Sequence, residues 1–187
     1  PGSLLLNDIC PEVEPYLSGL PDTPRFQFRA CDAESLPFPK GQDLIVSCSA
    51  IQWFEHPERF LCQCKDLLKT EGYLAFSTFG PQNVREVASL TSEALPYRSL
   101  EELRRMLSGV YQIVYSREEL LHRTFSSPLD VLKHLQATGV TGIRNRKWTK
   151  GQLEDFCRRY HRQYAAPDGT VSLTYHPIYM ICKKQEQ

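Results

Sequence analysis

Asp8, Asp32 and Ser49 each come directly after a run of strand-forming residues, and their types suit the binding of a nucleoside. A carboxylate at the end of a strand can accept two hydrogen bonds from the cis hydroxyls of a ribose. A second carboxylate beside a free backbone N–H, such as Asp32 beside Ala33, can bind the amino group and a ring nitrogen of adenine. Each Asp taken alone is more simply a turn residue, but together and in this order they indicate an adenosine site.

The elements that must position these residues alternate between strand and helix in the first half of the chain. We expect strands over Leu4–Leu6, Phe26–Cys31, Asp43–Cys48 and Tyr73–Phe79, a short helix over Glu12–Ser18 and a longer helix from Pro57 to about Lys69. This order predicts an α/β fold with a parallel sheet, in which ligands bind beyond the carboxyl ends of the strands. The segment Asp43–Cys48 is apolar in its middle, so we expect both of its faces to be covered.

Helices become more frequent in the second half. Ser99 with Glu102 forms a capping box, and Ser127 and Thr149 are further start signals. We expect helices from Ser99 to about Leu107, from Ser127 to near Gly139 and from Thr149 to about Tyr164, and strands over Val110–Tyr115, extending toward Phe125, and over Val171–Cys182. With 187 residues, the chain is predicted to be one α/β unit with an elaboration.

The charge is balanced overall but divided unevenly along the chain. Residues 1–80 hold 6 Lys and Arg against 11 Asp and Glu, whereas residues 81–187 hold 16 against 11. A cationic second half suits an anionic partner or substrate because the local field steers association, although a solvated helical surface has the same composition. The pI of 7.3 and the lack of a recognition motif argue against nucleic acid.

The seven cysteines form no Cys-x-x-Cys pair, and no His lies at zinc-finger spacing from a Cys pair. We therefore expect no metal site and a reduced, cytoplasmic protein. Cys10, Cys31, Cys48 and Cys182 lie in or beside apolar runs, where a free Cys is commonly a small buried side chain. No run approaches the roughly 18 apolar residues of a membrane helix, and the first eight residues lack the charged region of a signal peptide.

Several segments carry a resemblance to known enzymes. Asn7–Pro11, Asp32–Phe38 and Asp43–Ser47 resemble the acidic motif, the adenine motif and the fourth strand of the class I S-adenosylmethionine-dependent methyltransferases. Within that class, the biotin-pathway malonyl-acyl-carrier-protein O-methyltransferases are the closer match, and the resemblance rests on Ser49–Trp53, Phe76–Gly80, Ser127–Val140 and Leu173–His176.

The resemblance implies a Rossmann-like core, mostly parallel with an antiparallel final strand, over residues 1–116 and 166–187. Residues 117–165 would form a helical lid over the acyl substrate. The cofactor would be S-adenosylmethionine and its product S-adenosylhomocysteine. The residues implied in its binding are Asp8 on the ribose with Ile9 beside it, Asp32 and Ala33 on the adenine, and Ser49 near the methionyl end.

This chain departs from the family pattern at the glycine-rich loop, which in family members follows the first strand of the sheet. The ten glycines of this chain never cluster, and its first recognisable strand matches the family's second strand. We therefore expect the first strand and the glycine loop to be absent from this chain, weak cofactor binding or an inactive chain, and exposed apolar strand surface that favours self-association. A non-catalytic or assembly-factor relative is the alternative function, as is another small-molecule carboxyl or C-methyltransferase.

The chemistry that the resemblance implies needs no general base, because a malonyl carboxylate is already ionised at neutral pH. We accordingly assign no catalytic residue, and His134 is expected to be a partly buried, hydrogen-bonded histidine. Arg is the natural carboxylate anchor because its planar fork is bidentate. The candidates for substrate binding are Gln52, Trp53, Arg123, Arg98, Arg144 and Tyr175, with Arg123 first among the arginines.

Further residues expected to contact the substrate or its carrier lie in the final predicted strand and in the basic second half of the chain. Tyr175 and His176 are adjacent in a strand, so only one of them can face the site. The basic residues near Arg144 and along the helix after Thr149 suit an acidic carrier protein bearing the malonyl group.

Overall fold

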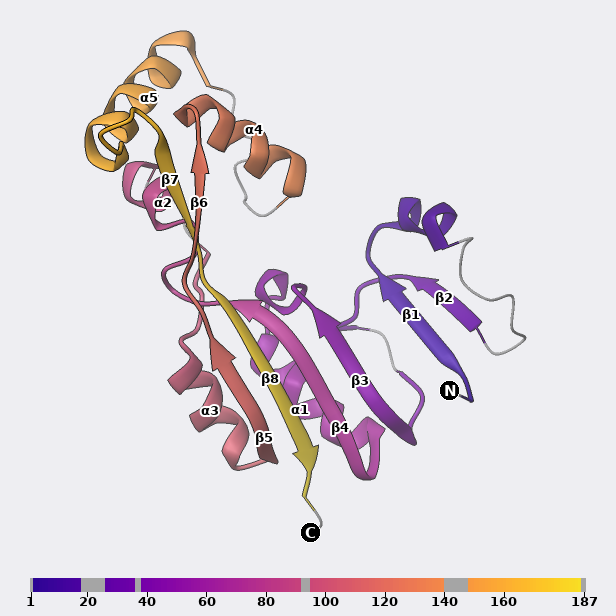
Figure 1. Cartoon of the computed structure of the whole chain (residues 1–187). Helices are drawn as coiled ribbons and strands as arrows, with labels where there is room; N and C mark the ends of the chain where they lie inside the picture. The colour runs from indigo at the N-terminus through magenta and orange to yellow at the C-terminus, as the bar shows by residue number, and fades with distance from the viewer. Residues whose placement is uncertain (1, 18–25, 36–37, 92–94, 140–147, 186–187) are drawn as a thin grey trace.

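The computed structural model describes residues 2–17, 26–35, 38–91, 95–139 and 148–185. Its strands form three sheets, of which the central one has four strands in the order β3-β4-β8-β5. The strands of this sheet are β3 (Gln42–Cys48), β4 (Leu68–Phe79), β8 (Pro177–Lys184) and β5 (Tyr111–Glu118). β3 and β4 are parallel, whereas β8 runs antiparallel to both β4 and β5. The α/β class and the antiparallel final strand are therefore confirmed (Figure 1).

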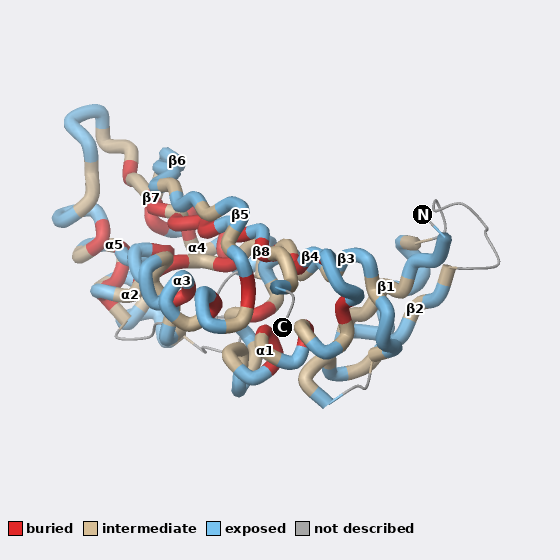
Figure 2. The backbone as a smooth tube through the Cα atoms, turned by 90° about the horizontal axis from the view of Figure 1, so that it is seen from below, coloured by how far each residue is buried: buried red, intermediate tan, exposed pale blue. Residues whose placement is uncertain are grey.

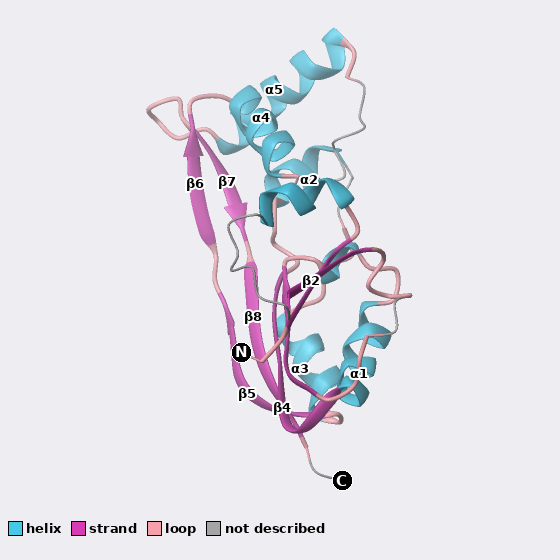
Figure 3. Ribbon diagram, turned by 90° about the vertical axis from the view of Figure 1, so that its right-hand side faces the viewer, coloured by secondary structure: helices cyan, strands magenta, loops and turns pink. Residues whose placement is uncertain are grey.

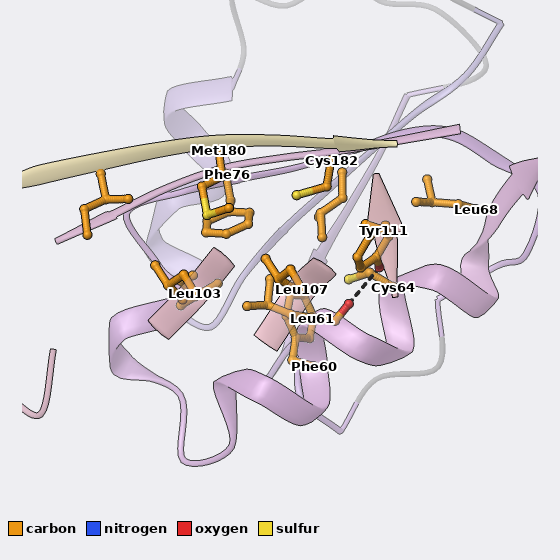
Figure 4. Close-up of a cluster of buried hydrophobic side chains, with 13 residues drawn as sticks. Phe60, Leu61, Cys64, Leu68, Phe76, Leu103, Leu107, Tyr111, Met180 and Cys182 are labelled. Carbon is orange, nitrogen blue, oxygen red and sulfur yellow. Dashed lines mark hydrogen bonds between the residues drawn. The ribbon is translucent and has the colours of Figure 1, made fainter. Parts of the chain in front are cut away.

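Two helices cover one face of the central sheet: α1 (Pro57–Leu67) and α3 (Leu100–Ser108) (Figure 3). Their apolar stripes meet inward-facing side chains of the sheet in a buried cluster that includes Leu61, Leu107, Phe76 and Met180 (Figure 4). Tyr111 lies in the same cluster, and its hydroxyl donates a hydrogen bond to the Leu61 carbonyl at 2.8 Å. Burial of these side chains supplies the main driving force for this layer.

The opposite face of the central sheet is uncovered by any described element, and the expectation for Asp43–Cys48 was wrong in this respect. Leu44 and Val46 are 54% and 57% exposed. Their register neighbours across β4, β8 and β5 include Tyr73, Tyr179, Ile181 and Tyr115, which are exposed as well. Strand pairing therefore gathers these six side chains into one apolar surface, which we call the open face.

A separate two-stranded parallel sheet holds the amino-terminal residues. It consists of β1 (Leu4–Asp8) and β2 (Phe26–Ala30), with the 3₁₀ helix η1 (Pro11–Leu17) after β1. This pair lies beyond β3, and no ladder hydrogen bonds join β1 to β3 among the described residues (Figure 1). The strands agree with the prediction to within two residues at each end.

A third sheet and three helices form a second packing unit above the central sheet. Its elements are α2 (Arg85–Thr91), β6 (Leu121–Phe125), α4 (Pro128–Thr138), α5 (Lys150–Tyr164) and β7 (Val171–Tyr175). Val87, Val131, Leu135, Phe156 and Leu173 belong to its own buried cluster, and Figure 2 shows buried segments in β7 and α5. The unit thus draws on residues before 117 and after 165 as well as on the segment between them.

Several local predictions differ from the structure, among them the start of β4, which lies at Leu68 and not at Tyr73. The final strand is divided at His176 into β7 and β8, which pair with different strands. Helix α2 was not predicted, because its seven residues give little periodic signal. Cys10 and Cys48 are exposed, not buried, because Cys10 follows the end of β1 and Cys48 lies on the open side of β3. No helix among the described residues combines the length and the apolar character that crossing a membrane requires.

Candidate cofactor and acceptor site

Asp8 and Asp32 lie at the carboxyl ends of the neighbouring parallel strands β1 and β2, as predicted. The Cys31 N–H donates to the Asp8 carbonyl at 2.9 Å, which ties the two strand ends together. Each carboxylate uses its Oδ1 in a local turn, Asp8 with the Cys10 N–H and Asp32 with the Glu34 N–H, both at 2.9 Å. The Oδ2 atoms accept no hydrogen bond from the described residues, so one oxygen of each carboxylate remains for a ligand.

The Ala33 N–H likewise donates to no partner within the described part of the chain. A free amide donor beside a carboxylate matches the acceptor nitrogen and the amino group of adenine. The side chain of Ile9 is 74% exposed next to Asp8 and offers an apolar contact. The free carboxylate oxygens, the free amide N–H and the apolar side chain therefore fit an adenosine, as the residue types alone had indicated.

Glu34 fixes the loop after β2 to the central unit, a role that the sequence did not reveal. Its two carboxylate oxygens accept hydrogen bonds from the backbone N–H groups of Glu55 and His56 at 2.7 and 2.8 Å. His56 is the N-cap of α1 and makes no side-chain capping bond. Glu34 thus caps α1 from a distance of 22 residues and supplies the negative charge that a helix N-terminus favours.

Ser49 lies where β3 ends, in a left-handed conformation with φ of 50°. Its N–H is within hydrogen-bond distance of both the carbonyl and the hydroxyl of Ser77, at 3.0 and 3.1 Å. The two serine hydroxyls are 3.3 Å apart. This local network orients polar groups at the ends of β3 and β4, where the family resemblance implies the methionyl end of the cofactor.

Gln52 and Trp53 lie in the short 3₁₀ helix η2 (Ile51–Trp53). The Gln52 amide donates to the Ser49 carbonyl and accepts from the Thr78 hydroxyl at 3.3 Å, so both of its polar atoms are engaged. Trp53 is 46% exposed and is therefore not a core residue. A cavity of about 140 Å³ extends beneath η2 and is lined by Ile51, Leu61, Tyr97, Arg98, Leu103 and Met106 among others.

The three candidate arginines differ in their surroundings. Arg98 forms an ion pair with Glu58 at the rim of the cavity, so its charge is already compensated. Arg144 lies outside the described residues. Arg123, on β6, is exposed and has no carboxylate within ion-pair distance in the described structure. Of the two candidates that the structure describes, Arg123 is therefore the one without a carboxylate partner.

Arg123 shares a face of the β6–β7 sheet with Tyr175. In the register, Leu121 pairs with Tyr175 and Arg123 with Leu173, so residues 121, 123, 173 and 175 point to one side. The hydroxyl of Tyr175 lies 2.8 Å from Nε2 of His134 on α4. The Tyr175 ring also contacts the Phe79 ring at the end of β4, with centroids 6.3 Å apart.

The pKa values in this cluster reflect burial and the Arg123 charge. Burial, and then the positive charge of Arg123, lower the pKa of His134. Burial raises the pKa of Tyr175, against opposing contributions from a hydrogen bond with Thr138 and from Arg123. Both effects of Arg123 agree with its place on the same side of the β6–β7 sheet as Tyr175. The cluster therefore joins a cation, a neutral imidazole and a protonated phenol at neutral pH.

His176 turns away from this cluster, in agreement with the alternation of the strand. Its Nδ1 accepts a hydrogen bond from the Gln82 N–H at 3.2 Å, so the proton of the neutral ring is on Nε2. Nε2 then donates to Glu118 at 3.0 Å. Both ring nitrogens are occupied by protein groups, so His176 serves the junction between β7 and β8.

Comparison with known proteins gives matches over the whole chain. The family model described as "Methyltransferase domain" matches residues 3–76. A malonyl-[acyl-carrier protein] O-methyltransferase of Bacteroides fragilis (strain 638R) is 48% identical, and the alignment covers 99% of this chain and 38% of that protein. Proteins of the same name from Bacteroides helcogenes and Bacteroides thetaiotaomicron are each 46% identical, with 100% of this chain and 72% and 75% of those proteins covered.

Solved structures extend the likeness to the fold. A methyltransferase structure from Bacillus halodurans C-125 superposes with a TM-score of 0.68 at 15% identity, covering 98% of this chain and 84% of that chain. The N-methyltransferase NodS from Bradyrhizobium japonicum, in complex with S-adenosyl-L-homocysteine, gives a TM-score of 0.54 at 10% identity, covering 98% and 67%. At these identities the superpositions establish the Rossmann-like methyltransferase fold.

Proposed function

Because the chain belongs to the malonyl-[acyl-carrier protein] O-methyltransferase family, we propose that the protein methylates the free carboxylate of a malonyl group on acyl-carrier protein, as a step of biotin biosynthesis. S-adenosylmethionine is the methyl donor, and S-adenosylhomocysteine is the expected by-product. When bound, the donor supplies a methyl group on a positively charged sulfur. All other features of the proposal concern residues of this chain.

The residues that would hold the donor are those at the ends of β1, β2 and β3. The free carboxylate oxygens of Asp8 and Asp32 and the free N–H of Ala33 support binding of the ribose and adenine. Ile9 would contact the adenosine, and the Ser49–Ser77 pair supports a place for the amino-acid end. These assignments follow from hydrogen-bonding capacity at the strand ends.

The acceptor carboxylate is its own nucleophile, since its reference pKa near 4 leaves it ionised at neutral pH. The protein therefore needs to orient the carboxylate and to exclude water, because a dry site favours a reaction that neutralises two opposite charges. This requirement supports the absence of a catalytic base among the assigned residues. It also makes a carboxylate anchor the most informative group in the site.

The observation that carries the proposal is that Arg123, which has no carboxylate partner among the described residues, lies on the same side of the β6–β7 sheet as Tyr175. An Arg that has a free fork can bind a carboxylate bidentately, and a phenol can donate a further hydrogen bond. Arg98 and Arg144 are weaker candidates, the first because of its Glu58 partner. Gln52 and Trp53 would line the path between this anchor and the donor.

The segment 117–165 would act as a lid over the acyl group, with 1–116 and 166–187 as the core. In Figure 1, α4 stands above the carboxyl end of β3, which supports a covering role for this segment. Helix α2 and strand β7 lie outside 117–165 but pack with it, so they would belong to the same covering unit. Lys150, Arg158, Arg159 and Arg162 place positive charge along α5, although Asp155 pairs with both Arg158 and Arg159. This helix is therefore the proposed surface for the acidic carrier. Seven free thiols support a cytoplasmic location.

The test is methyl transfer by the full-length protein with labelled S-adenosylmethionine. Malonyl-carrier protein should be labelled, and acetyl-carrier protein, which lacks the free carboxylate, should not. Alkaline hydrolysis should release the label as methanol, because the product is an ester. Labelling of other acids but not of malonyl-carrier protein would favour a general small-molecule methyltransferase, and no labelling at all would favour a non-catalytic relative.

A further inference from the structure

We propose that His134 is a positioning residue that directs the hydroxyl proton of Tyr175 toward an acceptor carboxylate held by Arg123. The inference rests on the proposed function, because it assigns the carboxylate of that reaction to this cluster. His134 touches neither the substrate nor the donor in this scheme. It acts through Tyr175, its hydrogen-bond partner at 2.8 Å.

The ring of His134 is held in place by the two strands of the β6–β7 sheet. The Phe125 ring on β6 lies with its centroid 5.1 Å from that of His134. The Tyr175 ring on β7 meets it nearly edge-on, at 6.1 Å and 86°. These two ring contacts restrict the orientation of the imidazole, so that its Nε2 faces the Tyr175 hydroxyl.

The protonation of this pair decides what Tyr175 can offer. A phenol has one proton, and if that proton points to His134 it is lost to any ligand. If His134 instead carries its proton on Nε2 and donates to the phenol oxygen, the Tyr175 proton is free to point elsewhere. A bound carboxylate accepts hydrogen bonds only, so it favours this second arrangement.

Arg123 provides the charge that brings a carboxylate to this position. In the strand register Arg123 lies on the same side of the β6–β7 sheet as Tyr175, and its positive charge contributes to the lowered pKa of His134. The positive charge also favours a neutral over a charged His134, which prevents the imidazole from competing for the anion. Arg123 would therefore hold the carboxylate, Tyr175 would fix its orientation, and His134 would fix Tyr175.

The test is a double-mutant cycle on residues 134 and 175. The equilibrium dissociation constant of malonyl-pantetheine is measured by calorimetry, and the KM and kcat for malonyl-carrier protein are measured with the full-length protein. His134→Leu and Tyr175→Phe should each raise the dissociation constant and the KM about ten-fold, the effect of one hydrogen bond to a charged group. In the Tyr175→Phe background, His134→Leu should have no further effect, because its route to the substrate is already removed.

His134→Gln is the conservative variant, since its amide N–H can replace the donor on Nε2. It should restore the dissociation constant to within about three-fold of the original. His161→Leu, which alters an exposed histidine of α5, is the matched control and should leave the dissociation constant of malonyl-pantetheine unchanged, because that ligand carries no carrier protein to contact α5. Circular dichroism of each variant verifies the fold.

Each outcome decides between the two proposals. If the unmodified protein methylates malonyl-carrier protein but the His134→Leu variant binds malonyl-pantetheine normally, the role of His134 is overturned and the proposed function stands. The role of His134 is also overturned if the fold-changes in the dissociation constant caused by His134→Leu and Tyr175→Phe multiply in the double variant. The same holds if His134→Gln binds malonyl-pantetheine as weakly as His134→Leu does. If the protein binds malonyl-pantetheine and the double-mutant cycle gives the expected result, but no methyl group is transferred, the proposed function is excluded and the positioning role of His134 stands. Failure of the unmodified protein to bind malonyl-pantetheine at all would overturn the His134 assignment.

Discussion

Gly80 faces the ring of His176 so closely that a β-carbon at position 80 would lie 2.5 Å from both Nδ1 and Cε1 of the imidazole. The ring cannot readily yield, because Gln82 and Glu118 hold its two nitrogens. The Gly80 N–H also donates to the His176 carbonyl at 2.7 Å. This contact joins the end of β4 to the point where β7 becomes β8.

We expect Gly80→Ala to destabilise the protein by about 1–3 kcal/mol, the usual cost of forcing extra volume into a packed site. Urea denaturation, followed by circular dichroism, measures the change in the free energy of unfolding. Gly151→Ala is the control, because a β-carbon there meets nothing within 4 Å and residue 151 is helical. That control should be neutral or slightly stabilising, and equal stability of both variants would contradict the prediction.

The local signals in the sequence were sufficient for most elements. Ser99 and Thr149 both form the capping boxes that begin α3 and α5, and Gly139 ends α4 with a φ of 67°. These features depend on residues within four positions of each other. The prediction failed where structure depends on distant partners, as at His176, where a strand with one continuous pattern changes from one sheet to another.

In the candidate site, too, the features that depend on neighbouring residues were predicted and those that depend on distant partners were not. Asp8 and Asp32 were predicted because a carboxylate after a strand is visible in the residue order. Arg123 was already placed first among the arginines from the sequence, but the ion pair of Arg98 with Glu58, which joins residues 40 positions apart, was not predicted. The bond between His134 and Tyr175 spans 41 positions and left no sequence signal beyond an expected partly buried histidine.

Glu86 provides a second test of packing between distant segments. It is buried on α2, and its carboxylate accepts hydrogen bonds from both the N–H and the hydroxyl of Thr174 on β7. Glu86→Gln should lose about 1–3 kcal/mol of stability, because one of these donors would then face an amide NH₂ group. Thermal and urea unfolding measure the loss. Glu101→Gln on the exposed surface of α3 should change stability by less than about 0.5 kcal/mol, and a similar small change for Glu86→Gln would refute the prediction.

The open face of the central sheet leads to a prediction about association. An apolar surface of this kind usually marks a contact with another protein surface, so we expect concentration-dependent self-association of the 187-residue chain. Val46→Lys should shift the population toward monomer while the circular dichroism spectrum stays unchanged, since Val46 is 57% exposed. Sedimentation velocity at several concentrations measures this. Ser108→Lys, at an exposed polar position of α3, adds the same charge and serves as the control, and an equal shift in both variants would exclude the open face as the cause.

The pKa of His134 predicts how stability depends on pH. Burial and the charge of Arg123 lower this pKa below its ordinary value of 6.5. The unfolded chain therefore binds a proton at a higher pH than the folded protein does, and the contribution of neutral His134 is complete above about pH 6.5 and declines as the pH falls below it. His134→Gln should show a shallower loss of unfolding free energy between about pH 7 and pH 5 than the original protein. Urea denaturation over this range measures both slopes, and identical slopes would contradict the assignment.

Arg123 and Arg98 can be separated by their kinetic effects. If Arg123 binds the acceptor carboxylate, Arg123→Ala should raise the KM for malonyl-carrier protein by about 10- to 100-fold, since a hydrogen bond to a charged group contributes about 1.5–3 kcal/mol. Arg123→Lys should recover part of this loss because it keeps the charge but not the planar fork. Arg98→Ala should have a smaller effect, because Glu58 already compensates that charge, and Arg104→Ala on the exposed side of α3 is the control. A larger effect of Arg98→Ala would instead assign the carboxylate to the cavity beside Tyr97.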